Sequence, residues 1–573
     1  MNEDVQEPLA RYRDEFREKF ARLAREKFAE LAKRSRVDVE ANRRLAAEVG
    51  KLQTEADSAK NRKTGYGCLA VVGFLTAAAS LAGAVAANGE SGRAQAWCVS
   101  GVVAGLILGI AVIPRFRAAS KRVGELRARI AEKKEIAWKQ MEPLNRLYTW
   151  DVTVGLIEAT VPRLKFDPYF TAERLASLRG RFGWDDSFND GKSVIFAQSG
   201  AVCGNPFVFG HYLEMKWGEK IYEGTKEISW TETVRGSDGK TRSVRRYETL
   251  RAHVTRPIPV YDERKLLLYG NAAAPNLSFS RRPSGLTGKD EGFWSSVRKR
   301  WRLNRLKAYS RDLTDDSDFT LMSNHEFETL FHAKDRDHEV EFRLLFTPAA
   351  QTQMLNLMKD STVGYGDDFT FIKRKKMNVL FSKHLDEATL DTDPSRFFNW
   401  DYDAAFSFFV RFNESYFKAV YFAMAPLLAI PLYRQTPPRE GARQGVPADA
   451  AASFWELESL ANHYGEDEFR HPDCVTRSLL KTRVVARADG ESRVAVTAYG
   501  YRGAERVDYE DVYGGDGRLH RVAVHWTEYL PVQRTSAMRL RERGAPSEFF
   551  GECAAASRGS LFRRSIVSSL EAS

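Results

Sequence analysis

Two long apolar runs interrupt a first quarter of the chain that is otherwise rich in charge. Residues 68–87 and 96–113 carry no charged side chain. Each run approaches the about 20 residues that a helix needs to cross a hydrocarbon core. Only residues 88–95 separate them, and more than sixty residues precede the first, so it is not a cleaved signal peptide. The pattern predicts a transmembrane helical hairpin over 66–114.

Basic residues flank the predicted hairpin on both sides. They are Lys60, Arg62 and Lys63 before the first run, and Arg115, Arg117, Lys121 and Arg122 after the second. The connecting turn holds Arg93 alone. Because basic residues stay on the cytoplasmic side, we expect a multi-pass protein of the cytoplasmic or inner membrane with both termini in the cytoplasm.

Small residues recur every four positions in both runs. The second run has Gly101, Gly105 and Gly109, and the first has Ala79, Gly83 and Ala87. Such spacing lets helix backbones approach closely in lipid, so we expect the runs to pack on each other or on a second copy. A pore is disfavoured, because neither run carries an ionisable residue along a path.

The segments outside the runs read as helices. Residues 7–63 are rich in Ala, Arg, Glu and Lys, and Leu45, Val49 and Leu52 begin an apolar seam that Ala56 and Ala59 continue. Val123, Leu126 and Ile130 repeat that spacing in 115–150. We expect residues 1–65 and 115–150 to form an antiparallel, coiled-coil-like stalk. Solvated single helices and a homodimeric coiled coil are the alternatives.

The remainder of the chain predicts an α+β region with mainly antiparallel sheet, because no regular β-helix-β alternation or phosphate loop is visible. Expected helices cover 152–161 and 171–182, the second capped by Thr171. A capping box at Ser323 and Glu326 and the pair Thr347-Pro348 start two more, running to 332 and 359. Expected strands cover 193–198, 207–217, 228–234, 242–255, 369–374, 377–382 and parts of 482–526. We divide the region into blocks 151–315, 316–434 and 450–573, with a Pro/Gly/Arg linker at 435–449.

Composition supports a mostly soluble chain with a basic excess. The 573 residues are 43% hydrophobic, with a mean hydropathy of −0.43 and 87 Lys+Arg against 76 Asp+Glu, a net charge of +11. These values exclude a disordered or fibrous protein. The five cysteines form no C-x-x-C pair, so neither a zinc ribbon nor a thioredoxin-like redox site is encoded. Their odd number fits a reducing compartment.

Part of that excess lies in residues 294–311. Seven side chains there are the candidate lipid-binding set: Arg298, Lys299, Arg300, Trp301, Arg302, Arg305 and Lys307. A basic helix of this kind binds anionic phospholipid head groups. A solvated basic linker and RNA binding are alternatives, but no aromatic RNA-binding string is present, so we expect no nucleic-acid partner.

No catalytic, metal or cofactor site stands out. Asp335, Asp337 and His338 lie together in sequence, as do Asp367 and Asp368, and acids of this kind can bind a cation or act in acid–base chemistry. Residues 362–367 spell the potassium-channel filter TVGYGD, but no long apolar inner helix follows. We therefore predict a glycine turn between a helix and a strand there.

Residues 420–433 are the other strongly apolar run. The run has fourteen residues and is interrupted by Pro426 and Pro431, so it is too short to span a membrane readily. A buried or interfacial segment is favoured. The preceding residues 406–417 are unusually aromatic. A membrane-associated enzyme or lipid-handling protein would have its site here.

The region 323–376 resembles bacterial two-span membrane proteins whose cytoplasmic domain has no assigned activity. The likeness rests on NHEFE at 324–328, FTPAA at 346–350 and GDDF at 366–369. It implies the same architecture and a prokaryotic inner membrane, and it transfers no catalytic residue.

These patterns together predict a membrane-anchored cytoplasmic scaffold. Its partners would be the lipid bilayer, an unidentified protein and a second copy of the chain. The lipid-handling protein is the competing interpretation.

Overall fold

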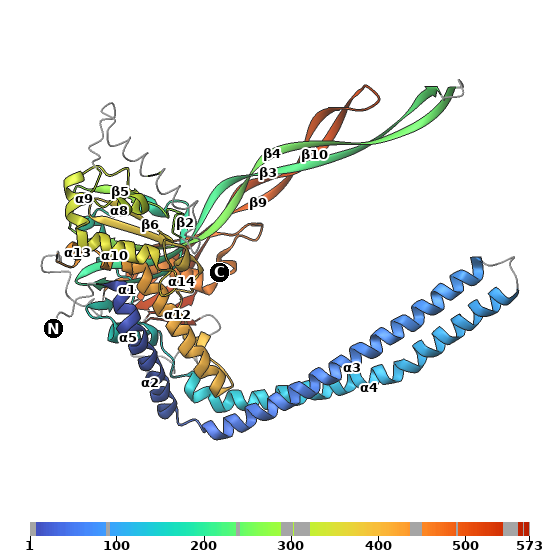
Figure 1. Ribbon diagram of the computed structural model, residues 1–573, viewed down its shortest axis with the longest axis horizontal. Helices are drawn as coiled ribbons and strands as arrows, with labels where there is room; N and C mark the ends of the chain where they lie inside the picture. The colour runs from blue at the N-terminus through green and yellow to red at the C-terminus, as the bar shows by residue number, and fades with distance from the viewer. Residues whose placement is uncertain are drawn as a thin grey trace. The chain divides into compact units, whose positions relative to one another are not determined.

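The computed structural model describes residues 7–86, 92–235, 241–287, 302, 321–435, 450–488, 491–542, 560–564 and 566–571. Over these residues the chain is α+β, as predicted, with two long apolar helices and two antiparallel sheets (Figure 1). It divides into a helical unit, residues 21–149 and 393–413, and a sheet unit, residues 1–20, 150–392 and 414–573.

Two long helices dominate the helical unit. Helix α3 covers Val39–Ala86 and α4 covers Gly92–Asn145, and they lie side by side (Figure 1). Along their polar parts Lys133 pairs with Glu48 at 2.8 Å, and Leu45 and Val49 are buried. At 1.5 Å per residue the 48 residues of α3 extend about 72 Å. Both helices are long and apolar enough to cross a membrane.

The expectation of one continuous helix over 7–63 is wrong. The chain forms α1 (Pro8–Arg11), a π-helical turn (Tyr12–Phe16) and α2 (Arg17–Ser35) before α3. Arg36 adopts a left-handed φ of 55°, and Asp38 Oδ1 accepts the Ala41 N–H at 2.9 Å. The break forms because this carboxylate caps the first turn of the next helix.

Residues 393–413 complete the helical unit. Asn42 anchors the start of α12 (Tyr402–Leu428), donating to the Trp400 carbonyl and accepting the Tyr402 N–H, each at 2.9 Å. Phe28 packs against Phe406 and Phe409 with ring centroids 5.2 and 5.6 Å apart. A short 3-10 helix, Pro394–Phe397, precedes α12.

The sheet unit holds both sheets. In spatial order the first contains β1 (Leu164–Phe166), β2 (Lys192–Val202), β3 (Asn205–Arg235), β4 (Thr241–Gly270), β7 (Met377–Ser382), β6 (Phe369–Arg374) and β5 (Ser278–Arg281). The second contains β11 (Ser560–Arg563), β12 (Ile566–Leu570), β10 (Leu519–Glu542), β9 (Glu491–Tyr513) and β8 (Leu479–Ala488). All named pairings are antiparallel.

Helix α14 (Phe454–Tyr464) joins the cores of the two sheets. Trp455 packs into the cluster on the first sheet, and Leu457 and Leu460 belong to the cluster on the second. Ser453 caps the helix by accepting the Glu456 N–H. One amphipathic helix with two apolar faces therefore serves both layers.

Two long hairpin ribbons extend from the sheets, β3–β4 and β9–β10 (Figure 1). The first matches the strands predicted at 228–234 and 242–255, and the second falls in the region where strands were predicted within 482–526, but both ribbons are longer than the sequence indicated. Their middle parts pack on each other through Leu250, Ala252 and Val254 on one side and Val522 and Val524 on the other. Where the ribbons extend beyond this cluster and the sheets, both of their faces are largely exposed. Apolar and polar residues therefore do not alternate there as they do in a half-buried strand, and the sequence does not indicate the full strand length.

The local predictions fare well in the sheet unit. Helices α5 (Asp151–Thr160), α6 (Ala172–Phe182, capped by Thr171) and α10 (Pro348–Lys359, capped by Thr347) are confirmed, as is the β6–β7 pair. The capping box at Ser323 is wrong: Asn324 caps α8 (His325–Phe331), because its amide oxygen accepts the Phe327 N–H at 3.1 Å. Among the described residues, this unit also contains α9 (Glu339–Leu345), α11 (Lys383–Glu387), α13 (Pro431–Gln435), α15 (Glu466–Phe469) and a 3-10 turn (Asp186–Asn189).

Candidate functional site

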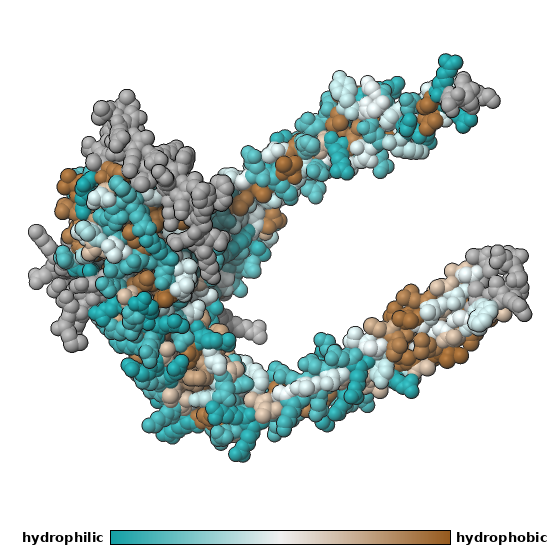
Figure 2. Space-filling view, viewed as in Figure 1, coloured by the Kyte–Doolittle hydropathy of each residue, from teal (hydrophilic) through white to brown (hydrophobic). Residues whose placement is uncertain are grey.

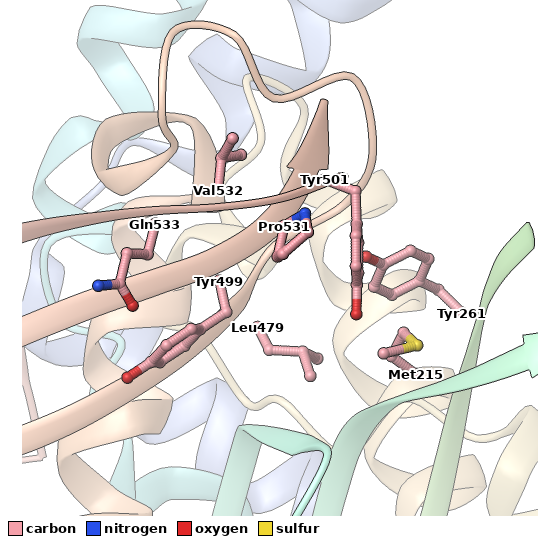
Figure 3. Close-up of a pocket in the computed structure, with 9 residues that line it drawn as sticks. Met215, Tyr261, Leu479, Tyr499, Tyr501, Pro531, Val532 and Gln533 are labelled. Atoms are coloured by element: carbon pink, nitrogen blue, oxygen red, sulfur yellow. The ribbon is translucent and has the colours of Figure 1, made fainter. Parts of the chain in front are cut away.

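A groove of about 400 Å³ opens where the two ribbons leave the sheets (Figure 3). Strand register builds it. Tyr499 lies opposite Gln533 and Tyr501 opposite Pro531, while Met215 lies opposite Tyr261. Directly opposed residues share a face, so these pairs form two facing walls. The lining residues are Met215, Tyr261, Leu479, Tyr499, Gly500, Tyr501, Pro531, Val532 and Gln533.

The groove is aromatic. Trp217 extends it, its ring 5.2 Å from that of Tyr501 in an edge-on arrangement, and Trp217 is 52% exposed. Tyr261 donates its hydroxyl to Thr476 Oγ1 at 3.2 Å. Burial raises the pKa of Tyr261 to about 12, so the phenol stays protonated at neutral pH. The residues that line the groove offer only phenols and one amide as polar side-chain groups, which suits binding better than acid–base chemistry.

Charged side chains beside the groove are paired. Arg477 contacts Glu263 at 2.7 Å and Glu466 at 3.5 Å, and His211 contacts Glu263 at 3.0 Å. Burial opposes ionisation of Glu263, but Arg477 and His211 outweigh it and lower the pKa of that carboxyl. Sequence reasoning missed this groove because its lining comes from five strands, β3, β4, β8, β9 and β10, that lie in two distant parts of the chain.

Most of the predicted lipid-binding segment lies outside the described residues. Arg302 alone is described: it is partly buried and donates to the Ser284 carbonyl at 3.2 Å. Burial lowers the pKa of Arg302. The lipid-binding assignment of Arg298, Lys299, Arg300, Trp301, Arg305 and Lys307 stays a prediction, as does the linker at 435–449.

The glycines of α4 contact α3 at residues other than Ala79 and Gly83, so packing of that predicted stripe on a second copy stays a prediction. A side chain at Gly105 would lie 2.6 Å from the Gly73 carbonyl and 2.7 Å from the Ala77 nitrogen. Gly109 faces the Phe74 ring and Gly101 faces Ser80. The close contact thus uses Gly73, Ala77 and Ser80. Ala79 is exposed and Gly83 is half-buried, while Ala87 lies outside the described residues.

The TVGYGD string forms the predicted turn between α10 and β6. Asp360 Oδ1 accepts the N–H groups of Thr362, Val363 and Gly364 at 2.7–3.2 Å. Gly366 has φ 69°, a conformation that glycine adopts without strain. Asp367 pairs with the buried Arg281. The turn is a structural brace.

Asp368, His384 and Ser382 have the residue types of a catalytic triad but a different geometry. His384 Nδ1 lies 2.5 Å from Asp368 Oδ2, while Nε2 lies nearer to the Ala419 carbonyl (3.2 Å) than to Ser382 Oγ (3.5 Å). The Tyr365 ring stacks on the imidazole at 4.1 Å, and the His384 side chain is 5% exposed. This cluster ties the turn to α12.

The other predicted acidic group braces β5. Asp335 Oδ1 accepts the Ser280 N–H at 2.8 Å, and Asp337 Oδ1 accepts that of Ser278 at 2.5 Å. His338 Nδ1 caps α9 by accepting the Glu341 N–H at 3.2 Å. Across the described part of the chain, no three His, Cys, Asp or Glu side chains converge to hold a metal ion.

Aromatic side chains of the region 414–430 pack against side chains near the N-terminus. Phe417 stacks on Phe20 at 4.3 Å, and Tyr421 donates to the Pro8 carbonyl at 2.8 Å. Tyr12 lies 4.8 Å from Phe422. N-terminal side chains therefore cover part of the region 406–433 in which the lipid-handling interpretation expects its site.

Comparisons with known protein families, with curated proteins and with solved structures found no match. The resemblance to two-span bacterial membrane proteins therefore stays a prediction.

Proposed function

We propose that this protein is a membrane-anchored interaction protein, in which α3 and α4 cross the cytoplasmic membrane as a hairpin and the sheet unit binds a protein partner in the cytoplasm. One observation carries the proposal. Large apolar side chains cover the outside of the two helices at 41–80% exposure: Leu69, Val71, Val72, Phe74, Leu75, Leu81, Trp97, Val99, Val103, Leu106, Ile107, Leu108 and Ile110.

Figure 2 shows these hydrophobic residues gathered over the ends of α3 and α4, next to the segment that connects them. Soluble proteins rarely expose apolar patches this large, and lipid covers them without cost. Close packing at Gly105 supports a paired span, because small residues let helices approach when no hydrophobic force drives them together. The coiled-coil-like stalk continues the pair outside the bilayer.

The partner-binding part rests on the aromatic groove. Tyr and Trp side chains supply large contact area with few rotatable bonds, and they are common at the centres of protein interfaces. We further propose that the basic segment 294–311 binds anionic lipid head groups on the cytoplasmic surface of the membrane. Packing of the 414–430 region against N-terminal rings favours this function over lipid handling.

Extraction of membranes with alkaline carbonate tests the anchor. The full-length chain should stay in the membrane pellet. Lysine at the exposed positions Leu75, Val103 and Ile107 should shift it to the supernatant, because each lysine at the bilayer centre costs about 2.5–3.5 kcal/mol. A matched control places lysine at Ala118, Glu132 and Ile136, exposed on the polar part of α4. Release of the unmodified chain would contradict the proposal.

A further inference from the structure

Helix α9 presents an apolar pair to solvent. Val340 is 65% exposed and Leu344 is 59% exposed. The other side of the helix packs on β5, because Phe342 and Leu345 are buried and the Phe342 ring lies 5.6 Å from that of Phe279. Residues four apart lie on one face of a helix, so the two aliphatic side chains form one apolar patch. Figure 2 shows hydrophobic residues on the surface over α9, which Figure 1 locates.

A basic turn follows β6. It comprises Arg374, at the end of that strand, and Lys375 and Lys376, which connect β6 to β7. Arg374 and Lys375 are exposed, and Lys376 is half-buried. The backbone of the turn is fixed, because Lys375 has a left-handed φ of 54° and its N–H donates to the Leu277 carbonyl at 3.0 Å. Beneath the turn, the buried Lys373 donates its ammonium group to the Lys375 carbonyl.

The apolar patch and the basic turn are neighbours. Glu341 Oε2 accepts the Leu277 N–H at 3.0 Å, and the carbonyl of the same residue accepts the Lys375 N–H. Successive residues of a helix differ by about 100° in direction, so Val340 and Leu344 lie about 60–100° around α9 from Glu341. The patch therefore adjoins the side of the helix that faces the turn. We define the basic–apolar surface as Val340, Leu344, Arg374, Lys375 and Lys376.

The acidic side chains of α9 are bound to other partners. Glu341 also accepts the Asn276 N–H at 2.9 Å and its side-chain amide at 2.8 Å. Glu339 pairs with the buried Arg336 at 2.7 Å and with Arg343 at 2.9 Å. The two aspartates that precede α9 bind the edge of β5, as described above. The three basic side chains of the turn therefore give this surface its charge.

We propose that the basic–apolar surface binds an anionic phospholipid bilayer, with the aliphatic pair inserted among the head groups and the turn in contact with lipid phosphates. Exposed apolar side chains beside basic ones match the two requirements of such a membrane surface. A stable protein interface covers about 800 Å² on each partner and is enriched in aromatic residues, whereas this surface has two aliphatic side chains.

The choice of a bilayer rests on the proposed function, because a membrane hairpin keeps the sheet unit beside the cytoplasmic leaflet, which is anionic. The contact goes beyond that function, since it lies apart from the predicted segment 294–311 in the chain. It would give the sheet unit a second attachment to the membrane that anchors it.

The expected affinity follows from the charges and the apolar area. Each Lys or Arg close to an anionic leaflet strengthens binding about fivefold, so the three charges of the turn contribute about 100-fold. Burial of the exposed parts of the two aliphatic side chains contributes at least about tenfold.

The test uses the full-length chain in nanodiscs of phosphatidylcholine. Flotation is measured with vesicles of phosphatidylcholine alone and with vesicles of phosphatidylcholine and phosphatidylglycerol in equal parts. The unmodified chain should float with the mixed vesicles. The variant R374Q/K375Q/K376Q should weaken that binding about 100-fold, and V340S/L344S should weaken it at least about tenfold.

Two matched controls remove the same types of exposed side chain elsewhere in the sheet unit. R483Q/R487Q/R502Q removes three exposed arginines from β8 and β9. V475S/V485S removes two valines that are 65% and 53% exposed. Both controls should bind the mixed vesicles as the unmodified chain does. Circular dichroism of each variant checks that the sheets stay folded.

A local label reports contact at the patch itself. An environment-sensitive fluorophore on a cysteine at Leu344, in an otherwise cysteine-free chain, should brighten with the mixed vesicles, and the same label at Val475 should not. Three results would overturn the inference: no response of the label at position 344, equal losses in the variants and their controls, or binding that does not depend on phosphatidylglycerol.

Failure of the anchor is seen separately. If α3 and α4 do not span the membrane, alkaline carbonate releases the unmodified chain, whatever the flotation result. If only the basic–apolar surface is wrongly assigned, the unmodified chain and V340S/L344S both stay in the membrane pellet, and flotation is the same for the two proteins.

Discussion

Replacing Asp367 by Asn should destabilise the sheet unit strongly. The Arg281 side chain is fully buried and that of Asp367 is 2% exposed. Arg281 also donates to the Phe369 carbonyl and stacks on the Phe369 ring at 4.1 Å, while Asp367 accepts both the Ser284 N–H and its hydroxyl. Burial lowers the pKa of Arg281, and Asp367 opposes this change. Arginine side chains in proteins remain charged at neutral pH. The substitution therefore leaves a buried cation without its counter-charge.

Breaking such a pair costs about 3–5 kcal/mol, a large share of the about 5–15 kcal/mol that stabilises a typical protein. With a urea dependence of about 3 kcal/mol/M, the unfolding midpoint should fall by about 1 M or more, measured by tryptophan fluorescence from the core residues Trp184 and Trp455. Combining Asp367→Asn with Arg281→Met should recover at least half of the loss, because the unpaired charge is then removed.

Asp360→Asn is the matched control in the same turn. Its side-chain oxygen can still accept the three backbone N–H groups, so the midpoint should move little. If Asp367→Asn costs no more than Asp360→Asn, the turn is not held by the buried pair and our reading of it is refuted.

Three more predictions concern the spans, pH and the basic segment. With cysteines at Ser80 and Gly101 in an otherwise cysteine-free chain, oxidation should cross-link α3 to α4. Gly105→Leu should reduce the yield of this cross-link about tenfold, because overpacking costs roughly 1.4 kcal/mol. The control Val103→Leu, on the exposed side of α4, should leave the yield unchanged. Burial raises the pKa of Glu458 from 4.5 to about 7, so the folded state binds more protons than the unfolded state in this range and stability should fall as pH rises from 5 to 7. Urea midpoints for Glu458→Gln should lose this slope, of at most about 1.4 kcal/mol per pH unit, and an equal slope in both proteins would contradict the assignment. Replacing Arg298, Lys299, Arg300 and Arg302 by Gln should weaken flotation of the nanodisc-bound chain with anionic vesicles, each lost charge removing about 1 kcal/mol, and unchanged flotation would remove the lipid-contact prediction.

Local signals predicted much of the fold. Thr171 and Thr347 were recognised as helix caps because the hydrogen bond that each hydroxyl accepts comes from a backbone N–H only three residues further on. A local sequence pattern is enough to predict such a bond. The strands 369–374 and 377–382 follow from a two-residue connection between alternating runs. The two apolar helices follow from length and composition alone.

The sequence did not predict features that depend on a choice between neighbouring capping residues or on contacts between separate helices. Ser323 and Asn324 both suit a cap, and only the packed helix selects Asn324. The break at Arg36 depends on Asp38 capping a new helix within a sequence that propensity alone would continue. The α3 face that meets Gly105 depends on helix rotation, which small-residue spacing leaves open between two stripes.

The roles of the candidate site residues also depend on partners that are distant in sequence. Asp335, Asp337 and Asp367 look chemically active in sequence because their partners, Ser280, Ser278 and Arg281, lie more than fifty residues away. The aromatic groove exists only because strand register aligns residues that are far apart in the chain. It leaves no motif in a single stretch of sequence.

The central claim is that α3 and α4 cross the membrane and leave the sheet unit in the cytoplasm. Labelling with a membrane-impermeant maleimide in intact cells tests it most directly, using cysteine-free chains with one cysteine at Ser91, between the spans, or at Ser395 or Thr476. We predict labelling at position 91 only, with the other two labelled after the membrane is permeabilised. Labelling of position 395 or 476 in intact cells, or failure to label position 91 there, would contradict the account.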